Sequence, residues 1–176
     1  MRIKNGCVTL RAIEERDFDL LYEMMNSEAI EKAMGHCTLP ISEKEQSEWM
    51  ANYHNSEEQI RLMIELSNGK TIGVIMLFDI DTYNGTAEIG HKISAKPEDR
   101  IKGDITDALN GMLDLAFNTL RLNCVTARTV EGNIFAEKIL KKSHFVEEGT
   151  LRHRIYQDGK FLNMHSFSVV KSDFCK

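Results

Sequence analysis

The first half of the chain changes its hydrophobic period, which separates helical from extended segments. Apolar side chains recur at helical spacing over about residues 16–26, whereas residues 60–66 alternate between apolar and polar positions, as a half-buried strand does. Between them, Ser42 and Glu45 form a capping-box pattern, which predicts the start of a second helix. Residues 8–12 are a short strand candidate ahead of the first helix. We therefore expect a strand, two helices and a second strand, in this order.

Asn-Gly and Asp-Gly pairs mark the turns between the remaining strands. Asn68-Gly69 predicts a hairpin with a type I′ turn, in which both positions need a positive φ. Asn84-Gly85 marks a second turn, and Asp158-Gly159 marks a closing hairpin. The strands expected around these turns are residues 71–78, 86–93, 145–156 and 161–170.

The second half of the chain also alternates helix and strand. Behind Gly103, apolar residues recur at helical spacing up to Leu120, which predicts a long amphipathic helix. A strand over residues 124–128 and a short helix ending near Lys142 follow. The expected order, β-α-α-β-β-β-α-β-α-β-β, predicts the α/β (α+β mixed) class, with a mixed, mostly antiparallel sheet flanked by helices. Because the sequence shows no repeat or linker, we expect a single domain over residues 1–176.

Composition and charge narrow the class of protein. The chain has 176 residues, 42% apolar and 28% charged, an ordinary balance for a globular protein. Its net charge of −5 argues against nucleic-acid binding, which needs surplus Lys and Arg to neutralise phosphates. No apolar run has the length of a membrane span or a signal peptide, so we expect a cytoplasmic protein without membrane contact. Four scattered cysteines without metal-binding spacing predict reduced thiols and no metal site: Cys7, Cys37, Cys124 and Cys175.

One segment has the composition of an anion-binding loop. It lies between a strand and the long helix and consists of Arg100, Ile101, Lys102, Gly103, Asp104 and Ile105. A glycine lets backbone approach a ligand closely, and a helix start offers free N–H groups that carry a partial positive charge. A single glycine at a helix start can equally serve the turn alone. The segment by itself leaves both interpretations open.

Short motifs accompany this order of elements. They are Leu10-Arg11 with Asp17-Phe18, Ala87-Glu88-Ile89-Gly90, Arg100-x-x-Gly103-x-Ile105, Asn133 followed by Ser143-His144-Phe145-Val146-Glu147-Glu148-Gly149, and the closing Leu151-Arg152 and Asp158-Gly159-Lys160. Their order and spacing resemble the GNAT superfamily of acetyl-CoA-dependent N-acetyltransferases over about residues 8–174. Within it, they are most similar to the branch of ribosomal-protein N-terminal and spermidine acetyltransferases.

The sequence departs from the family pattern at the proposed phosphate loop. Ile105 stands where a small residue is commoner, so a side chain takes some of the room for phosphate. Asp99 and Asp104 place negative charge beside the proposed anion site, and His144 replaces the glycine that precedes Phe145 in the family. These departures bear on cofactor affinity rather than on the fold.

The resemblance implies direct transfer of an acetyl group from acetyl-CoA to a primary amine, with no metal. The cofactor-binding residues that it implies are Ile93, Arg100, Ile101, Lys102, Gly103, Asp104, Ile105 and Asn133. Asn133 has a second interpretation as the N-cap of the short helix that follows, and the two roles are compatible.

Glu88 is the candidate general base, because the matching glutamate of the branch faces the acceptor near the thioester. The alternative is a strand carboxylate that pairs with a neighbouring basic side chain. His91 and His153 are weaker candidates for a proton relay. The tyrosine acid of many relatives is Leu140 here, and a serine of some relatives is Ala136, so the general acid is unassigned. Two tyrosines could replace it, although the sequence does not place them: Tyr83 and Tyr156.

The acceptor remains open between a polyamine or other small amine and a protein N-terminus. The rival hypothesis is a non-catalytic acyl-CoA-binding or regulatory domain with the same fold, which the altered phosphate loop and the missing acid favour. The resemblance also implies a possible homodimer, although no interface is visible in the residues.

Overall fold

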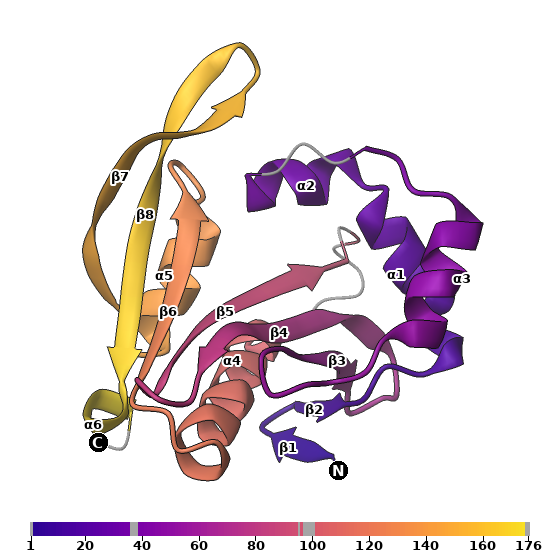
Figure 1. Ribbon diagram of the computed structural model, residues 1–176, viewed down its shortest axis with the longest axis horizontal. Coiled ribbons are helices and arrows are strands. Elements are labelled where there is room, and N and C mark those ends of the chain that lie inside the picture. The colour runs from indigo at the N-terminus through magenta and orange to yellow at the C-terminus, as the bar shows by residue number, and fades with distance from the viewer. Residues whose placement is uncertain (1, 36–38, 95, 97–100, 175–176) are drawn as a thin grey trace.

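In the computed structural model, which describes residues 2–35, 39–94, 96 and 101–174, the chain forms one eight-stranded sheet flanked by helices (Figure 1). The strands are β1 (Ile3–Asn5), β2 (Val8–Arg11), β3 (Ile60–Leu66), β4 (Thr71–Asp81), β5 (Thr86–Ile93), β6 (Cys124–Val130), β7 (Val146–Gln157) and β8 (Lys160–Val170). The helices are α1 (Phe18–Met25), α2 (Glu28–Met34), α3 (Glu43–Asn52), α4 (Asp104–Asp114), α5 (Ile134–Lys142) and α6 (Lys171–Phe174), with a 3₁₀ turn η1 (Glu15–Asp17) before α1 and a π-helical turn η3 (Leu115–Thr119) after α4.

The strands lie in the order β1-β2-β3-β4-β5-β6-β8-β7, and every neighbouring pair is antiparallel except β5 and β6. The parallel pair is short: three residues of β5, Thr86 to Glu88, face Cys124 to Thr126 of β6. Beyond this point the two strands diverge (Figure 1). The sheet is therefore open in its middle, next to Glu88.

The two faces of the sheet bury different helices. Leu62, Ile64 and Ile75 pack in the core cluster that holds the apolar side of α4, whose residues 105, 108, 109, 112 and 113 follow helical spacing. Met63 and Val74 alternate with them and point to the opposite face, where they pack against α1 and α2. The helices α1–α3 therefore cover one face and α4 the other, as expected for the α/β (α+β mixed) class.

A buried ion pair joins the first strand motif to the first helix. The guanidinium of Arg11 on β2 donates two hydrogen bonds of 2.7 Å to the carboxylate of Asp17, and both side chains are 2% exposed. Glu65 on β3 accepts a third bond, from Nε of Arg11. The Leu10-Arg11 and Asp17-Phe18 motif thus fixes where α1 begins over the sheet.

The sequence predictions for the main elements are confirmed, with two differences. The hairpin at Asn68-Gly69 forms, but only Gly69 has a positive φ, at 84°, so the type I′ turn is wrong there. A three-residue loop closed by a left-handed glycine replaces it. Asp158 and Gly159 do have positive φ values of 48° and 79°, as a type I′ turn requires.

The pattern analysis missed three short elements, β1, α2 and the four-residue α6. β1 has three residues and is held by its register with β2. α2 has seven residues, and its caps are visible in the sequence, because Ser27 accepts a hydrogen bond from the N–H of Ile30 and Gly35 ends the helix at φ 73°. Among the described residues, no helix is long and apolar enough to cross a membrane.

Candidate active site

A cavity of about 270 Å³ occupies the opening between β5 and β6. Its walls come from residues 89–93 of β5, residues 127–130 of β6, and parts of α2, α4 and α5. Within the described residues, this part of β5 pairs with β4 on one edge and has no strand on the other. An extended ligand with amide groups can therefore lie along the open edge as an added strand would.

A second cavity of about 570 Å³ lies at the start of α4. It shares Ile105 and Phe135 with the first cavity, so the two cavities are adjacent, and we refer to them together as the groove. The predicted cofactor residues divide between them: Ile93 and Asn133 line the first, Ile105 lines both, and Ile101, Lys102, Gly103 and Asp104 line the second. Arg100 lies outside the described residues.

The start of α4 is partly occupied by the protein itself. Gly103 precedes the helix with φ 97°, a left-handed conformation that a side chain would strain. The carboxylate of buried Asp104 accepts hydrogen bonds from the N–H of Ile105 at 2.7 Å and of Ile101 at 3.1 Å. Two backbone donors that we expected to be available to a phosphate are thus engaged. In the described part of the chain, the N–H groups of Lys102, Gly103 and Thr106 have no acceptor.

Ile105 does not fill the phosphate space as its size suggested. Its side chain is 1% exposed and packs in the main core cluster, where it forms the wall at which the two cavities meet. The more important departure at this loop is therefore the carboxylate of Asp104, which brings negative charge to the helix start.

Asn133 connects α5 to α2. Its side-chain oxygen accepts a hydrogen bond of 3.2 Å from the N–H of Ala136, which confirms the N-cap. Its amide nitrogen donates to the carbonyl oxygen of Ala33 at 3.3 Å. Gln157 also donates to α2, at the carbonyl of Lys32. These bonds hold α2 beside the opening between β5 and β6, where Ala29, Ile30, Ala33 and Met34 line the cavity.

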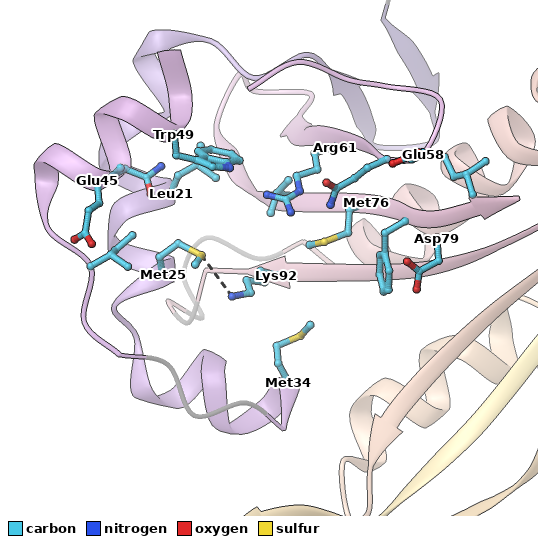
Figure 2. A pocket seen from close by; sticks show the side chains of 16 residues that line it. Leu21, Met25, Met34, Glu45, Trp49, Glu58, Arg61, Met76, Asp79 and Lys92 are labelled. Atoms are coloured by element: carbon cyan, nitrogen blue, oxygen red, sulfur yellow. Dashed lines mark hydrogen bonds between the residues drawn. The ribbon is translucent and has the colours of Figure 1, made fainter. Parts of the chain in front are cut away.

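A third and larger cavity, about 930 Å³, lies between the sheet and helices α1 and α3 (Figure 2). It shares Met34 and Lys92 with the cavity between β5 and β6, so it borders the groove. Met25, Met76 and Trp49 give it a largely apolar lining. We call it the acceptor cavity, because it meets the groove where the sheet opens.

Glu88 lies on β5, on the same strand as Gly90 and Lys92, and is not itself among the residues that line the three cavities. Its register partner on β4 is Phe78, and the next pairs are Gly90 with Met76 and Lys92 with Val74. Phe78, Met76, Val74 and Lys92 all line the acceptor cavity, so Glu88 lies on the sheet face that this cavity covers. The register of β5 with β4 is unbroken from Glu88 to Ile93, and the irregular register lies in β4, between Phe78 and Asp81.

The carboxylate of Glu88 forms an ion pair with Arg128 of β6. Nε of Arg128 lies 2.9 and 3.0 Å from the two carboxylate oxygens, and Nη2 bonds one of them as well. The hydrogen bonds that Arg128 donates to Glu88 raise the pKa of its guanidinium, and the nearby charge of Asp79 adds to this. The pairing that we weighed against a catalytic role is therefore present, and the role of Glu88 as a base stays a prediction.

The other candidates for proton transfer lie in different places. His91 lines the cavity between β5 and β6, as do Leu140 and Ala136. His153 lies on β7 with φ 52°, and its ring contacts Phe161. The two tyrosines are exposed and line none of the three cavities: Tyr83 is 95% exposed and Tyr156 is 65% exposed.

Two polar residues of the acceptor cavity were missed by the sequence analysis, Arg61 on β3 and Gln46 on α3. The alternation in residues 60–66 places Arg61 on the face of Met63, but a pattern cannot show which helices cover that face. Gln46 lies on the capped helix after Ser42 and is 3% exposed, which is unusual for a glutamine.

Comparisons with known proteins agree with this geometry. A family model described as an acetyltransferase (GNAT) domain matches residues 8–146. The relatives include YdaF of Bacillus subtilis, named provisionally as a ribosomal N-acetyltransferase, with 28% identity over 97% of this chain and 94% of the relative. They also include the spermidine N(1)-acetyltransferase of Vibrio cholerae, with 24% identity over 97% of this chain and 96% of the relative.

A solved structure shows the same fold. The crystal structure of spermidine N-acetyltransferase from Vibrio cholerae in complex with CoA and spermine has a TM-score of 0.86 to this chain at 24% identity, covering 98% of this chain and 100% of that one. The resemblance of the sequence motifs, the family match over most of the chain and the shared fold point the same way. The chain belongs to the GNAT acetyltransferase family.

Proposed function

We propose that this chain transfers an acetyl group from acetyl-CoA directly to a primary amine, either a small amine or a peptide N-terminus. The observation that carries the proposal is the adjacency of the three cavities, which share lining residues. The groove extends from the start of α4 to the opening between β5 and β6, and it borders the acceptor cavity at Lys92 and Met34. A cofactor and an acceptor that enter from the two ends would meet near Gly90 and Lys92, on the strand that carries Glu88.

The groove offers acetyl-CoA a contact for each of its parts. The N–H groups of Lys102, Gly103 and Thr106 and the ammonium of Lys102 would bind the diphosphate at the positive end of α4. The pantetheine amides would bond the open edge of β5 up to Ile93, with Asn133 on the opposite wall. This placement brings the thioester to the point where β5 and β6 part.

The reaction needs the acceptor amine in its neutral form. For a lysine-like amine with a pKa near 10.4, deprotonation at pH 7 costs about 4–5 kcal/mol, but for a peptide α-amino group near 7.7–8.0 only about 1 kcal/mol. The nitrogen lone pair attacks the thioester carbonyl, an N–C bond forms, and the C–S bond breaks with its electron pair on sulfur. A thiol with a pKa near 8.5 leaves readily as thiolate near neutral pH, so no strong acid is needed.

Glu88 is the proposed acceptor of the amine's proton. Arg128 donates hydrogen bonds to its carboxylate and so fixes its position, on the sheet face of Phe78 and Gly90. We expect Glu88→Gln to lower kcat/KM about 10²- to 10³-fold for an amine of high pKa, because a positioned base contributes about 10²–10⁴-fold. The decrease should be smaller for a peptide N-terminus, which needs less help to lose its proton. The measurement is CoA release as a function of pH, and an unchanged kcat/KM would remove Glu88 from this role.

The function itself is tested by two measurements on the full chain. Calorimetry with acetyl-CoA should show saturable binding, and a panel of amines and peptides should include acceptors that release CoA thiol steadily. Binding without release from any acceptor would favour the non-catalytic acyl-CoA-binding alternative. No binding at millimolar cofactor would contradict both.

A further inference from the structure

The acceptor cavity contains a cation with no carboxylate of its own. Arg61 on β3 lies with its guanidinium 5.4 Å from the ring centre of Trp49 and 5.5 Å from that of Tyr53, and these two rings stack on each other. The amide oxygen of Gln59, in the orientation that satisfies both groups, accepts from Arg61 at 2.7 and 3.0 Å. The side chain is therefore held in place by aromatic and amide contacts.

No acidic side chain neutralises Arg61 in the part of the chain that the structure describes. Burial lowers the pKa of its guanidinium, which shows that water solvates the charge only in part. Lys92, the other cation of the cavity, differs because its ammonium pairs with Glu31 of α2. Arg61 is half-buried, so its charge keeps part of its hydration, and a bound anion would replace the part that is lost.

Gln46 gives a second, independent indication. Its side chain lines the same cavity and is 3% exposed, and its amide nitrogen has no hydrogen-bond acceptor among the described residues. Buried polar groups without a partner are rare in folded proteins and often mark a ligand site. A group that completes both Arg61 and Gln46 must supply acceptor oxygens, and the Gln46 amide nitrogen, which protein atoms enclose here, has to turn toward the cavity to reach it.

The acidic side chains of the cavity lie elsewhere. Figure 2 shows Arg61 and Lys92 directed toward the middle of the cavity, while Glu45 lies toward one end and Glu58 and Asp79 lie toward the other. Glu45 is already bonded to the N–H and hydroxyl of Ser42. A linear polyamine would place positive charge in the apolar middle, against Arg61, whereas an anionic group would be attracted there.

We propose that the acceptor is a primary amine that also carries a carboxylate, as an amino acid or a short peptide does, and that Arg61 and Gln46 bind this carboxylate. The proposal rests on the acetyl transfer described above and names its substrate class. Arg61, Met76 and Gly90 are register partners on three adjacent strands, so the backbones of Arg61 and Gly90 are roughly 10 Å apart. The amine lies toward Gly90, the carboxylate toward Arg61, and the apolar part of the acceptor against Met25 and Met76.

The test compares matched acceptors that differ only in the carboxylate. Dipeptides with an apolar first residue and ω-amino acids of increasing length are each paired with the corresponding carboxamide, and spermidine is included. We expect kcat/KM from CoA release to be about 10- to 100-fold higher for the carboxylates, because hydrogen bonds to a charged group are among the strongest that a protein makes. An equal rate for each pair, or a preference for spermidine, would overturn the proposal and leave the acetyltransferase function standing.

Variants separate binding of the carboxylate from folding. Arg61→Met keeps an unbranched, largely apolar side chain without the guanidinium and should raise KM for carboxylate acceptors about 10- to 100-fold, with a change below about threefold for the carboxamides. Arg61→Lys should recover part of the difference, because it keeps the charge but loses the paired donors. Arg152→Met on exposed β7 is the matched control and should behave as the parent. Equal effects of Arg61→Met on both acceptor series would contradict the proposal.

A readout without turnover distinguishes the two hypotheses. Trp49 is the single tryptophan of the chain and contacts Arg61, so its emission should change saturably when carboxylate acceptors are titrated in the presence of CoA. This change should be lost in Arg61→Met and absent with the carboxamides. If it occurs without CoA release from acetyl-CoA, the proposed reaction fails and the carboxylate site stands. If it does not occur with any carboxylate, the carboxylate site is wrong.

Discussion

The start of α4 and the acceptor cavity both present hydrogen-bond donors to a ligand, but the chain treats their donors differently. At α4, Asp104 bonds the N–H groups of Ile101 and Ile105. In the acceptor cavity, Arg61 has no carboxylate and the Gln46 amide nitrogen has no acceptor among the described residues. At the start of α4, a ligand has to compete with the carboxylate of Asp104 for the backbone N–H groups. In the acceptor cavity, no carboxylate of the described residues occupies the donors, and a ligand with acceptor oxygens would stabilise them.

The two sites also differ in whether the same charge favours the stability of the protein or the binding of a ligand. A carboxylate near a helix N-terminus stabilises the helix but repels a diphosphate at the same place. A cation without a partner does the reverse, because it costs stability until an anion binds. The following predictions test this contrast, and their expected effects decrease from the first to the last.

The largest expected effect is on the free energy of unfolding, at Lys92, where the acceptor cavity borders the groove. Lys92 lines both the acceptor cavity and the groove, and its ammonium pairs with Glu31, which is 5% exposed. Lys92→Met should lower the free energy of unfolding by about 3–5 kcal/mol, because it leaves a buried carboxylate without its cation. Urea denaturation measures this, and the double variant Lys92→Met with Glu31→Leu should recover most of the loss. A single variant within about 1 kcal/mol of the parent would show that the pair is unimportant for stability.

An intermediate effect is expected at α4. Asp104→Asn removes the negative charge that competes with the diphosphate, and we expect acetyl-CoA to bind about fivefold more tightly, corresponding to about 1 kcal/mol. The same change should lower stability by roughly 0.5–1 kcal/mol, because charge-assisted bonds to two N–H groups are weakened. Calorimetry and denaturation measure the two quantities.

The control for this change is Asp107→Asn, in the same first turn of α4. The carboxylate of Asp107 accepts from the N–H of Cys7 and does not line the groove. If both variants raised cofactor affinity equally, helix-start charge in general, rather than the bonds of Asp104, would be responsible. An Asp104→Asn protein that binds acetyl-CoA more weakly would contradict the comparison outright.

The smallest effect is a pH dependence in the acceptor cavity. Hydrogen bonds from the backbone and hydroxyl of Ser42 lower the pKa of Glu45 below its ordinary value of 4.5. The bond therefore stabilises the start of α3 fully above about pH 4.5, and this contribution is lost as the pH falls through the lowered pKa. Because α3 carries Trp49, the emission of Trp49 should change over this acidic window, and Glu45→Gln should weaken the change. An identical acid profile in both proteins would remove this explanation.

Much of the fold could be predicted from the sequence because local rules and burial agree along most elements. The capping box at Ser42 starts α3 as predicted, and the alternation in residues 60–66 gives β3. Asp158-Gly159 adopts the two positive φ values of its turn type, whereas Asn68-Gly69 does not, because a dipeptide allows a turn without choosing the loop length. α2 was missed because seven residues carry too little periodic signal.

The candidate site was predictable only in part. Residues that line the groove could be named because their motif lies next to a recognisable helix start, as with Gly103, and because Asn133 precedes a helix that it caps. The carboxylate of Asp104 bonding its own helix start could not be foreseen, since the same residue could have pointed to solvent. Arg61 gave no signal, because a charged residue in an alternating strand is ordinary.

The sequence by itself determined the order of the main elements and the family, because these depend on short-range patterns of burial, capping and turn residues; that the loop before α4 binds a diphosphate stays a prediction. Only the tertiary structure decided that β5 and β6 part at Glu88, that Arg128 pairs with that carboxylate, and that α1 and α3 enclose Arg61 and Gln46. These features bring together side chains that are distant in the sequence. Whether a charge or a hydrogen-bond donor finds a partner therefore depends on how the helices and strands pack.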